Sequence, residues 1–131
     1  RSTLFPYTTL FRSDSVTQRG IDTVLDIGEF DRNIEDADLI ITGEGCLDHQ
    51  SVHGKVPIGV TERALKKNKN TVAVVGSLGK GYELAFSHGL KAVESTVCYP
   101  LMIEKAMQNA RTLVPDAAER LMRAIAAGKD L

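Results

Sequence analysis

This sequence has little of what marks disulfide-rich, membrane-spanning or nucleic-acid-binding proteins. It has only two cysteines in 131 residues, too few for the disulfide framework of a small secreted domain. No apolar run approaches the roughly 20 residues that a helix needs to span a bilayer. The 16 basic and 17 acidic residues give a net charge of −1, so no global basic field would attract nucleic acid or an anionic membrane. We therefore expect a cytoplasmic protein that binds neither nucleic acid nor membrane.

The first 13 residues, RSTLFPYTTLFRS, differ in character from the rest. Pro6 and Tyr7 interrupt their apolar patch, and neither an initiator Met nor a small-residue cleavage site is present, so a signal peptide is not favoured. The segment resembles the in-frame translation of a common sequencing-library adapter. We expect residues 1–13 to be a non-native scar, the native sequence to begin near Asp14, and the chain to be a fragment.

The most informative stretch lies in the middle of the chain. The apolar run Leu39–Ile41 predicts a strand that is buried on both faces. Gly43 and Gly45 follow, and we expect them to form a tight turn, because glycine adopts positive φ and lets backbone N–H groups approach a ligand closely. Glu44 and Asp48 would then stand at the carboxyl end of the strand, where open α/β sheets bind their ligands.

The remaining sequence alternates between helical and strand patterns. Apolar spacing predicts helices at 20–27, 30–37, 57–69, 82–88, 101–113 and 115–127, and strands at 71–75 and 91–97. Gly89 should end one helix as its C′ residue, and Pro115 should divide the last two. Such alternation implies right-handed crossovers and a parallel sheet. The predicted fold class is α/β, a three-layer, Rossmann-like parallel sheet with helices on both faces, present as an incomplete domain.

Glu44, Asp48 and Lys55 could carry out phosphoryl transfer. Carboxylate oxygens suit Mg²⁺, while a cation and backbone N–H groups stabilise the charge on the transferring group. The same residues also fit a turn whose carboxylates cap the next helix and whose lysine is solvated. The pattern alone leaves both interpretations open.

Two further segments could bind ligands, but their patterns are incomplete. The loop 76–81 could cradle phosphate at a helix N-terminus, yet it matches neither standard nucleotide fingerprint, which also argues against a Rossmann-like dehydrogenase. Cys46, His49 and His53 are three potential zinc ligands without a fourth, so their spacing gives little support for a zinc site.

Several motifs together resemble the bacterial glycerate kinase family. They are ADLIITGEG at 37–45, LD at 47–48, QS at 50–51 and GKVPIGV at 54–60. GID at 20–22, VLD at 24–26 and VAVVG at 72–76 fit the same pattern in the same order. The resemblance covers essentially residues 14–131, which we interpret as the C-terminal part of a glycerate kinase α/β domain.

This resemblance implies a Mg²⁺-dependent transfer of the ATP γ-phosphoryl group to a hydroxyl of D-glycerate, giving 2-phosphoglycerate. It makes Glu44, Asp48 and Lys55 the candidate catalytic residues, with Glu44 and Asp48 also the candidate Mg²⁺ ligands. The candidate substrate- and phosphate-binding loop consists of Thr42, Gly43, Gly45, Gln50, Ser51 and Gly54.

One position departs from the family pattern, since Cys46 stands where the family usually has arginine. A thiol cannot replace a guanidinium that binds carboxylate or phosphate in bidentate fashion. The expected partners are D-glycerate and ATP, and no oligomeric state is predicted. The fragment itself is expected to be inactive, and the alternative is a non-catalytic α/β module that binds an anion or a nucleotide.

Overall fold

Within residues 19–129, three parallel strands in the order β1–β2–β3 form one sheet. The computed structural model describes residues 19–129, so the predicted scar at 1–13 lies outside the described residues. The strands are β1 (Ile40–Leu47), β2 (Thr71–Leu78) and β3 (Leu90–Ser95). The helices are α1 (Gly20–Ile27), α2 (Phe30–Asn33), the 3₁₀ turn η2 (Ser51–His53), α3 (Val56–Leu65), α4 (Leu84–Ser87), α5 (Ile103–Gln108) and α6 (Ala110–Lys129).

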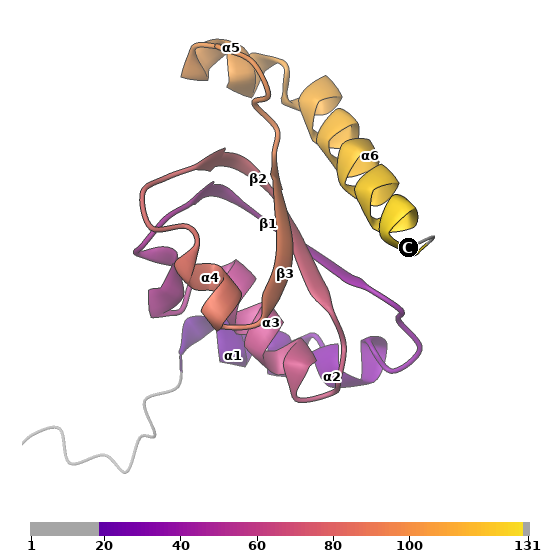
Figure 1. The fold of residues 1–131 in the computed structure, drawn as a ribbon. Coiled ribbons are helices and arrows are strands. Elements are labelled where there is room, and N and C mark those ends of the chain that lie inside the picture. The colour runs from indigo at the N-terminus through magenta and orange to yellow at the C-terminus, as the bar shows by residue number, and fades with distance from the viewer. Residues whose placement is uncertain (1–18, 130–131) are drawn as a thin grey trace, which may run out of the picture.

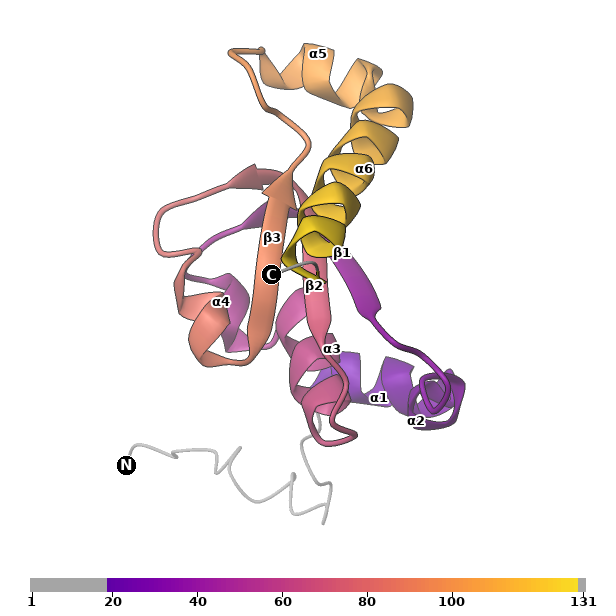
Figure 2. The same cartoon turned by 45° about the vertical axis from the view of Figure 1, so that its right-hand side comes forward.

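Helices cover both faces of the sheet, as the alternation of helix and strand predicted. Ala73 and Val75 of β2 are fully buried in a core shared with α3 and α4. The residue between them, Val74, faces Val114 of α6 across a cavity, because successive strand residues point to opposite faces. Figures 1 and 2 show α6 along β2 and β3, with α5 beyond the carboxyl end of β3. The three-layer α/β prediction is confirmed.

Two hydrophobic clusters hold the layer formed by α1 to α4 against the sheet. The first joins the end of β1 to α3, β2, α4 and β3 through Leu47, Ile58, Ala73, Val75, Ala85 and Leu90. The second joins α1 and α2 to α3 and the start of β1 through Leu25, Ile34, Ile40, Val60 and Ala64. Burial of this apolar area is the main favourable contribution to folding.

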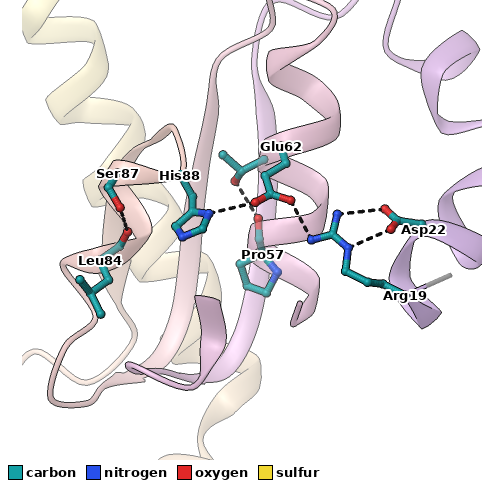
Figure 3. A network of polar contacts seen from close by, with 8 residues as sticks. Arg19, Asp22, Pro57, Glu62, Leu84, Ser87 and His88 are labelled. Carbon is teal, nitrogen blue, oxygen red and sulfur yellow. Dashed lines mark hydrogen bonds and ion pairs between the residues drawn. The ribbon is translucent and has the colours of Figure 1, made fainter. Parts of the chain in front are cut away.

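Ion pairs reinforce the outer surface of the same layer (Figure 3). Glu62 of α3 lies between Arg19, whose Nη1 is 2.8 Å from its Oε2, and His88, whose Nδ1 is 2.9 Å from its Oε1. Arg19 also pairs with Asp22 of α1 at 2.9 Å. Partial burial by itself would raise the pKa of Glu62, but the hydrogen bonds from Arg19 and His88 outweigh it, so the pKa lies below its ordinary value.

The predicted glycine turn at 43–45 is wrong, because β1 continues through Gly43 and Gly45 to Leu47. A Cβ on Gly43 would lie 2.8 Å from the Val74 carbonyl oxygen, and a Cβ on Gly76 would overlap the Gly45 carbonyl. These glycines therefore serve close approach of two strands, not a turn. The prediction of burial on both faces is also wrong at Ile41, which is 53% exposed.

Other differences concern the ends of helices. Helix α3 ends at Leu65, not Lys69, and Asn68 follows with a left-handed φ of 56°. Pro115 does not divide two helices, because the break lies at Asn109 and Pro115 is inside α6. Pro115 is the sixth residue of α6, and the helix continues through it although its nitrogen cannot donate to the Arg111 carbonyl four residues earlier. The C′ position of Gly89 is confirmed by its φ of 101°.

A pair of alanine variants tests the glycine contact between β1 and β2. Gly76→Ala should lower the free energy of unfolding by about 1–3 kcal/mol, because its Cβ would overlap a backbone atom that cannot rotate away. Gly45→Ala is the matched control, since a Cβ there meets nothing within 4 Å. Urea unfolding measures both. Equal losses in the two variants would contradict the assigned contact.

Candidate functional site

The carboxylate of Asp48 is the centre of a polar network just after β1. Its Oδ1 accepts hydrogen bonds from the backbone N–H of Gln50 at 3.0 Å and of Ser51 at 3.1 Å, and from the Ser51 hydroxyl at 3.1 Å. In return, the Asp48 N–H donates to Ser51 Oγ at 3.0 Å. These bonds close the turn that leads into η2, where unpaired backbone N–H groups need acceptors.

Lys55 adds a positive charge to the same network. Its Nζ lies 3.6 Å from Asp48 Oδ1, and its backbone forms the N-cap of α3. Partial burial by itself would raise the pKa of Asp48, but the Ser51 hydroxyl, Lys55 and the two backbone N–H groups outweigh it and lower the pKa. Since a helix N-terminus also favours negative charge, Lys55 and α3 together create a locally positive environment.

The loop after β2 packs directly against this network. The Gly79 N–H donates to the Leu47 carbonyl at 2.8 Å, and the His49 N–H donates to the Lys80 carbonyl at 3.0 Å. Neither glycine of this loop has room for a side chain, because a Cβ at Gly79 would lie 2.8 Å from Asp48 Cβ, and one at Gly81 would lie 2.8 Å from His49 Cβ. Gly81 also has a φ of 82°, which glycine adopts without strain. The loops after β1 and β2 therefore form one unit.

A cavity of about 810 Å³ lies at the carboxyl ends of the strands, between the sheet and the α5–α6 segment. Its walls are mostly apolar side chains, including Val74, Val97, Leu101, Ile103, Met107 and Val114, and its polar lining includes Glu44, Cys46, Ser77 and Thr96. This volume and character are those of small-molecule sites. Cys46 links the cavity to the Asp48 network, because it lines the cavity and its carbonyl lies 3.5 Å from the Ser51 hydroxyl.

The structure divides the predicted site residues into two groups. Asp48, Ser51, Lys55 and the Gln50 backbone come together in the network, and Gly54 ends η2 with a φ of 98°. The second group lies in β1 and not in a loop, and it consists of Thr42, which is 8% exposed, Gly43, Glu44 and Gly45. Of these, Glu44 and Gly45 line the cavity.

The alternative interpretation, that the carboxylates cap the next helix, is wrong for α3, because its N-cap is Lys55 and no side chain caps it. Asp48 accepts the Gln50 and Ser51 N–H groups within its own turn. Glu44 instead accepts the N–H of the adjacent Gly45 at 3.1 Å. These hydrogen bonds do not bury Asp48 completely, because its side chain is 24% exposed and lies beside Lys55, whose side chain is 39% exposed.

Sequence reasoning missed the cavity wall formed by α5 and α6. Ile103 and Met107 are 68% and 73% exposed, although helical spacing favoured packing in the core. Their apolar character was visible in the sequence, but nothing there indicated that this helix lies beyond the end of β3 (Figure 1). Nor did the sequence indicate that its residues line a cavity. Sequence reasoning also missed the role of Gly79 and Gly81 in supporting the loop 48–55 between β1 and α3, which we call the acidic loop.

Residues 19–129 contain neither a cluster of metal-binding side chains nor a membrane-spanning helix. Within this range no three His, Cys, Asp or Glu side chains gather around a possible metal position. Mg²⁺ commonly takes one or two carboxylates and completes its shell with phosphate and water, so Glu44 and Asp48 stay predicted ligands. None of the described helices is long and apolar enough to cross a membrane.

Comparison with known proteins gives a consistent result. A sequence model of the "Glycerate kinase family" matches residues 7–126. Similar curated proteins include the glycerate kinase of Halalkalibacterium halodurans, 41% identical over 78% of this chain and 27% of that protein, and the glycerate kinase of Bacillus subtilis, 39% identical over 84% and 28%. The glycerate 2-kinase of Escherichia coli is 35% identical over 83% and 29%.

A solved structure agrees with the sequence comparisons. The fold superposes with a TM-score of 0.65 on a crystal structure from Salmonella typhimurium that carries the name glycerate kinase 2, at 38% identity over 87% of this chain and 29% of that one. The chain thus spans less than a third of the length of these relatives. The family match begins within residues 1–13, and the origin of that segment stays a prediction.

The environment of Asp48 predicts a pH dependence of stability. Because its pKa is lower when folded than the unfolded value of about 3.9, ionised Asp48 stabilises the fold above about pH 4, and this contribution disappears as the pH falls further through the folded pKa. Asp48→Asn should therefore unfold at a lower temperature than wild type at pH 7, with the gap closing below about pH 4. Thermal unfolding from pH 7 to pH 2 measures this. A gap that stays constant to pH 2 would contradict the assignment.

Proposed function

The chain belongs to the glycerate kinase family, and from this we propose that it is part of an enzyme that transfers the γ-phosphoryl group of ATP to a hydroxyl of D-glycerate. The 2-hydroxyl is the favoured acceptor, giving 2-phosphoglycerate, because one similar protein is named glycerate 2-kinase. The observation that carries the proposal is the family match over residues 7–126.

The chemistry of the acidic loop supports this proposal. Phosphoryl transfer needs groups that position two anionic substrates and neutralise developing charge, and it needs little covalent chemistry from the protein. Lys55, at the N-terminus of α3, offers a cation for a phosphate or for the glycerate carboxylate. Glu44 and Gly45 line a cavity whose volume of about 810 Å³ suits a small organic substrate or part of a nucleotide.

Two carboxylates of this region fit the requirements of Mg²⁺. The carboxylate contacts of Asp48 described above all use Oδ1. Glu44 lies in the cavity wall, and its Oε1 accepts the N–H of Gly45. Either could supply an oxygen ligand, with ATP phosphates supplying others. When bound, Mg²⁺ would neutralise charge on the phosphates. Lys55, Asp48 and the Gln50–Ser51 backbone would orient the charged groups around it.

The 131 residues alone should not turn over substrate. They span 27–29% of the relatives described above, and phosphoryl transfer loses efficiency steeply when groups on either side of a cleft are missing or misplaced. A chain of this kind could still bind anions at the loop that follows β1, as a module without catalysis. A cytoplasmic location also stays a prediction.

Turnover by the full-length protein is the direct test. Coupled ADP release should depend on D-glycerate and Mg²⁺, and Asp48→Asn and Lys55→Gln should each lower kcat/KM roughly 100-fold or more, because each removes a charge that orients the substrates. Asp36→Asn and Lys67→Gln are matched controls, since both wild-type residues are exposed and lie before β1 and after α3. ADP release that is no faster with glycerate than without it would refute the proposed activity.

Position 46 offers a second test of the family assignment. Cys46 lines the cavity, and the family resemblance implies arginine there. Cys46→Arg in the full-length protein should raise kcat/KM by roughly tenfold or more, because a guanidinium holds carboxylate and phosphate in bidentate fashion. Cys98→Arg, at the other and exposed cysteine, controls for added charge. A fall in activity at position 46 would show that this site does not accommodate the family residue.

A further inference from the structure

Ser51 is fully buried, which sets it apart from the other polar residues of the acidic loop. A side chain with no exposed surface cannot contact a substrate that arrives from solvent. Its hydroxyl both accepts and donates a hydrogen bond. Oγ accepts the Asp48 N–H at 3.0 Å and donates to Asp48 Oδ1 at 3.1 Å, while the Cys46 carbonyl lies farther away, at 3.5 Å. Both main interactions of Ser51 thus go to one residue.

We propose that Ser51 is a positioning residue, which fixes the orientation of the Asp48 carboxylate through its buried hydroxyl and does not itself bind substrate. The effect of Ser51 on catalysis rests on the proposed kinase function. Its structural half, that Ser51 holds Asp48, depends only on the geometry of this loop.

The need for such a residue follows from the surroundings of Asp48. Lys55 Nζ, at 3.6 Å, is the charged group in contact with the carboxylate and sits on a long side chain that is 39% exposed. A mobile ammonium ion gives attraction without a fixed direction. The loop 79–81 also packs against Asp48, with Gly79 beside the Asp48 Cβ, and its hydrogen bonds to the loop after β1 are between backbone atoms. Ser51 and two backbone N–H groups are therefore the directional partners that fix the carboxylate.

Ser51 is also bonded to the segment that leads into α3. It sits at the start of η2, and its carbonyl accepts the Lys55 N–H at 3.3 Å. The group that orients Asp48 is thus tied to the segment that carries Lys55 into α3. Sites whose reactive groups are held by such buried partners keep the geometry that catalysis requires.

The test uses Ser51→Ala in the full-length protein. We expect kcat to fall about tenfold to hundredfold with a smaller change in KM, since a misplaced carboxylate harms the transition state more than ground-state binding. Thr61→Val is the matched control, because Thr61 is also buried and its hydroxyl donates to the Pro57 carbonyl at 2.7 Å, within α3. This control should lose stability without losing kcat.

A double-mutant cycle separates positioning from an independent role. If Ser51 acts through Asp48, Ser51→Ala should cause no further loss in an Asp48→Asn background, whereas independent effects would multiply. Wild-type kcat in Ser51→Ala, multiplying effects, or an equal loss of kcat in Thr61→Val would each overturn the inference.

Amide exchange gives a readout that does not depend on activity. The Gln50 N–H is bonded to Asp48 Oδ1, so its protection should fall at least about threefold in Ser51→Ala if Asp48 is released. Absence of glycerate-dependent turnover in wild type would refute the proposed function, and the exchange result would then decide the structural half alone. Unchanged protection would overturn that half, whatever the activity.

Discussion

The close approach of β1 and β2 along glycine backbone is the constraint on which the arrangement of this site depends. Gly43 faces the Val74 carbonyl and Gly76 faces the Gly45 carbonyl, with no room for a Cβ at either glycine. The pairing continues beyond these glycines to Cys46 with Ser77 and Leu47 with Leu78. The loops that follow β1 and β2 therefore begin at the same edge of the sheet, and they are in contact from their first residues.

At that shared edge, backbone hydrogen bonds tie the acidic loop to the loop after β2. Backbone bonds from Gly79 to Leu47 and from His49 to Lys80 continue the ladder where regular strand ends. The Asp48 carboxylate is then surrounded by fixed donors, so the cost of partly burying it is offset by hydrogen bonds and by Lys55. A site made from two loops that brace each other keeps its geometry better than one made from a single free loop.

Most elements of the fold could be predicted from apolar spacing, while the use of its glycines and the boundaries of some helices could not. Glycine after an apolar run predicts a turn and close strand contact equally well, and only the partner strand decides between them. The sequence predicts a turn at Gly43 and Gly45, but both lie in β1, and a Cβ on Gly43 would meet the Val74 carbonyl of β2. Pro115 predicts a break between two helices, but α6 continues through it, because the loss of one N–H donor does not end a helix of 20 residues. The residue types of the acidic loop were predictable, whereas the cavity was not, because its far wall comes from Ile103 and Met107.

The lowered pKa of Asp48 bears on two roles that a carboxylate could have in the proposed reaction, Mg²⁺ ligand or acceptor of the substrate hydroxyl proton. A carboxylate that is ionised well below neutral pH is a weak proton acceptor, since general bases work best when their pKa lies near the working pH. The same ionisation suits a cation ligand, because Mg²⁺ binds the charged oxygen. In phosphoryl transfer the hydroxyl proton can leave late and positioning contributes most of the rate. The contacts that bind Asp48 to Ser51 and Lys55 therefore favour a fixed negative charge over proton transfer at this position.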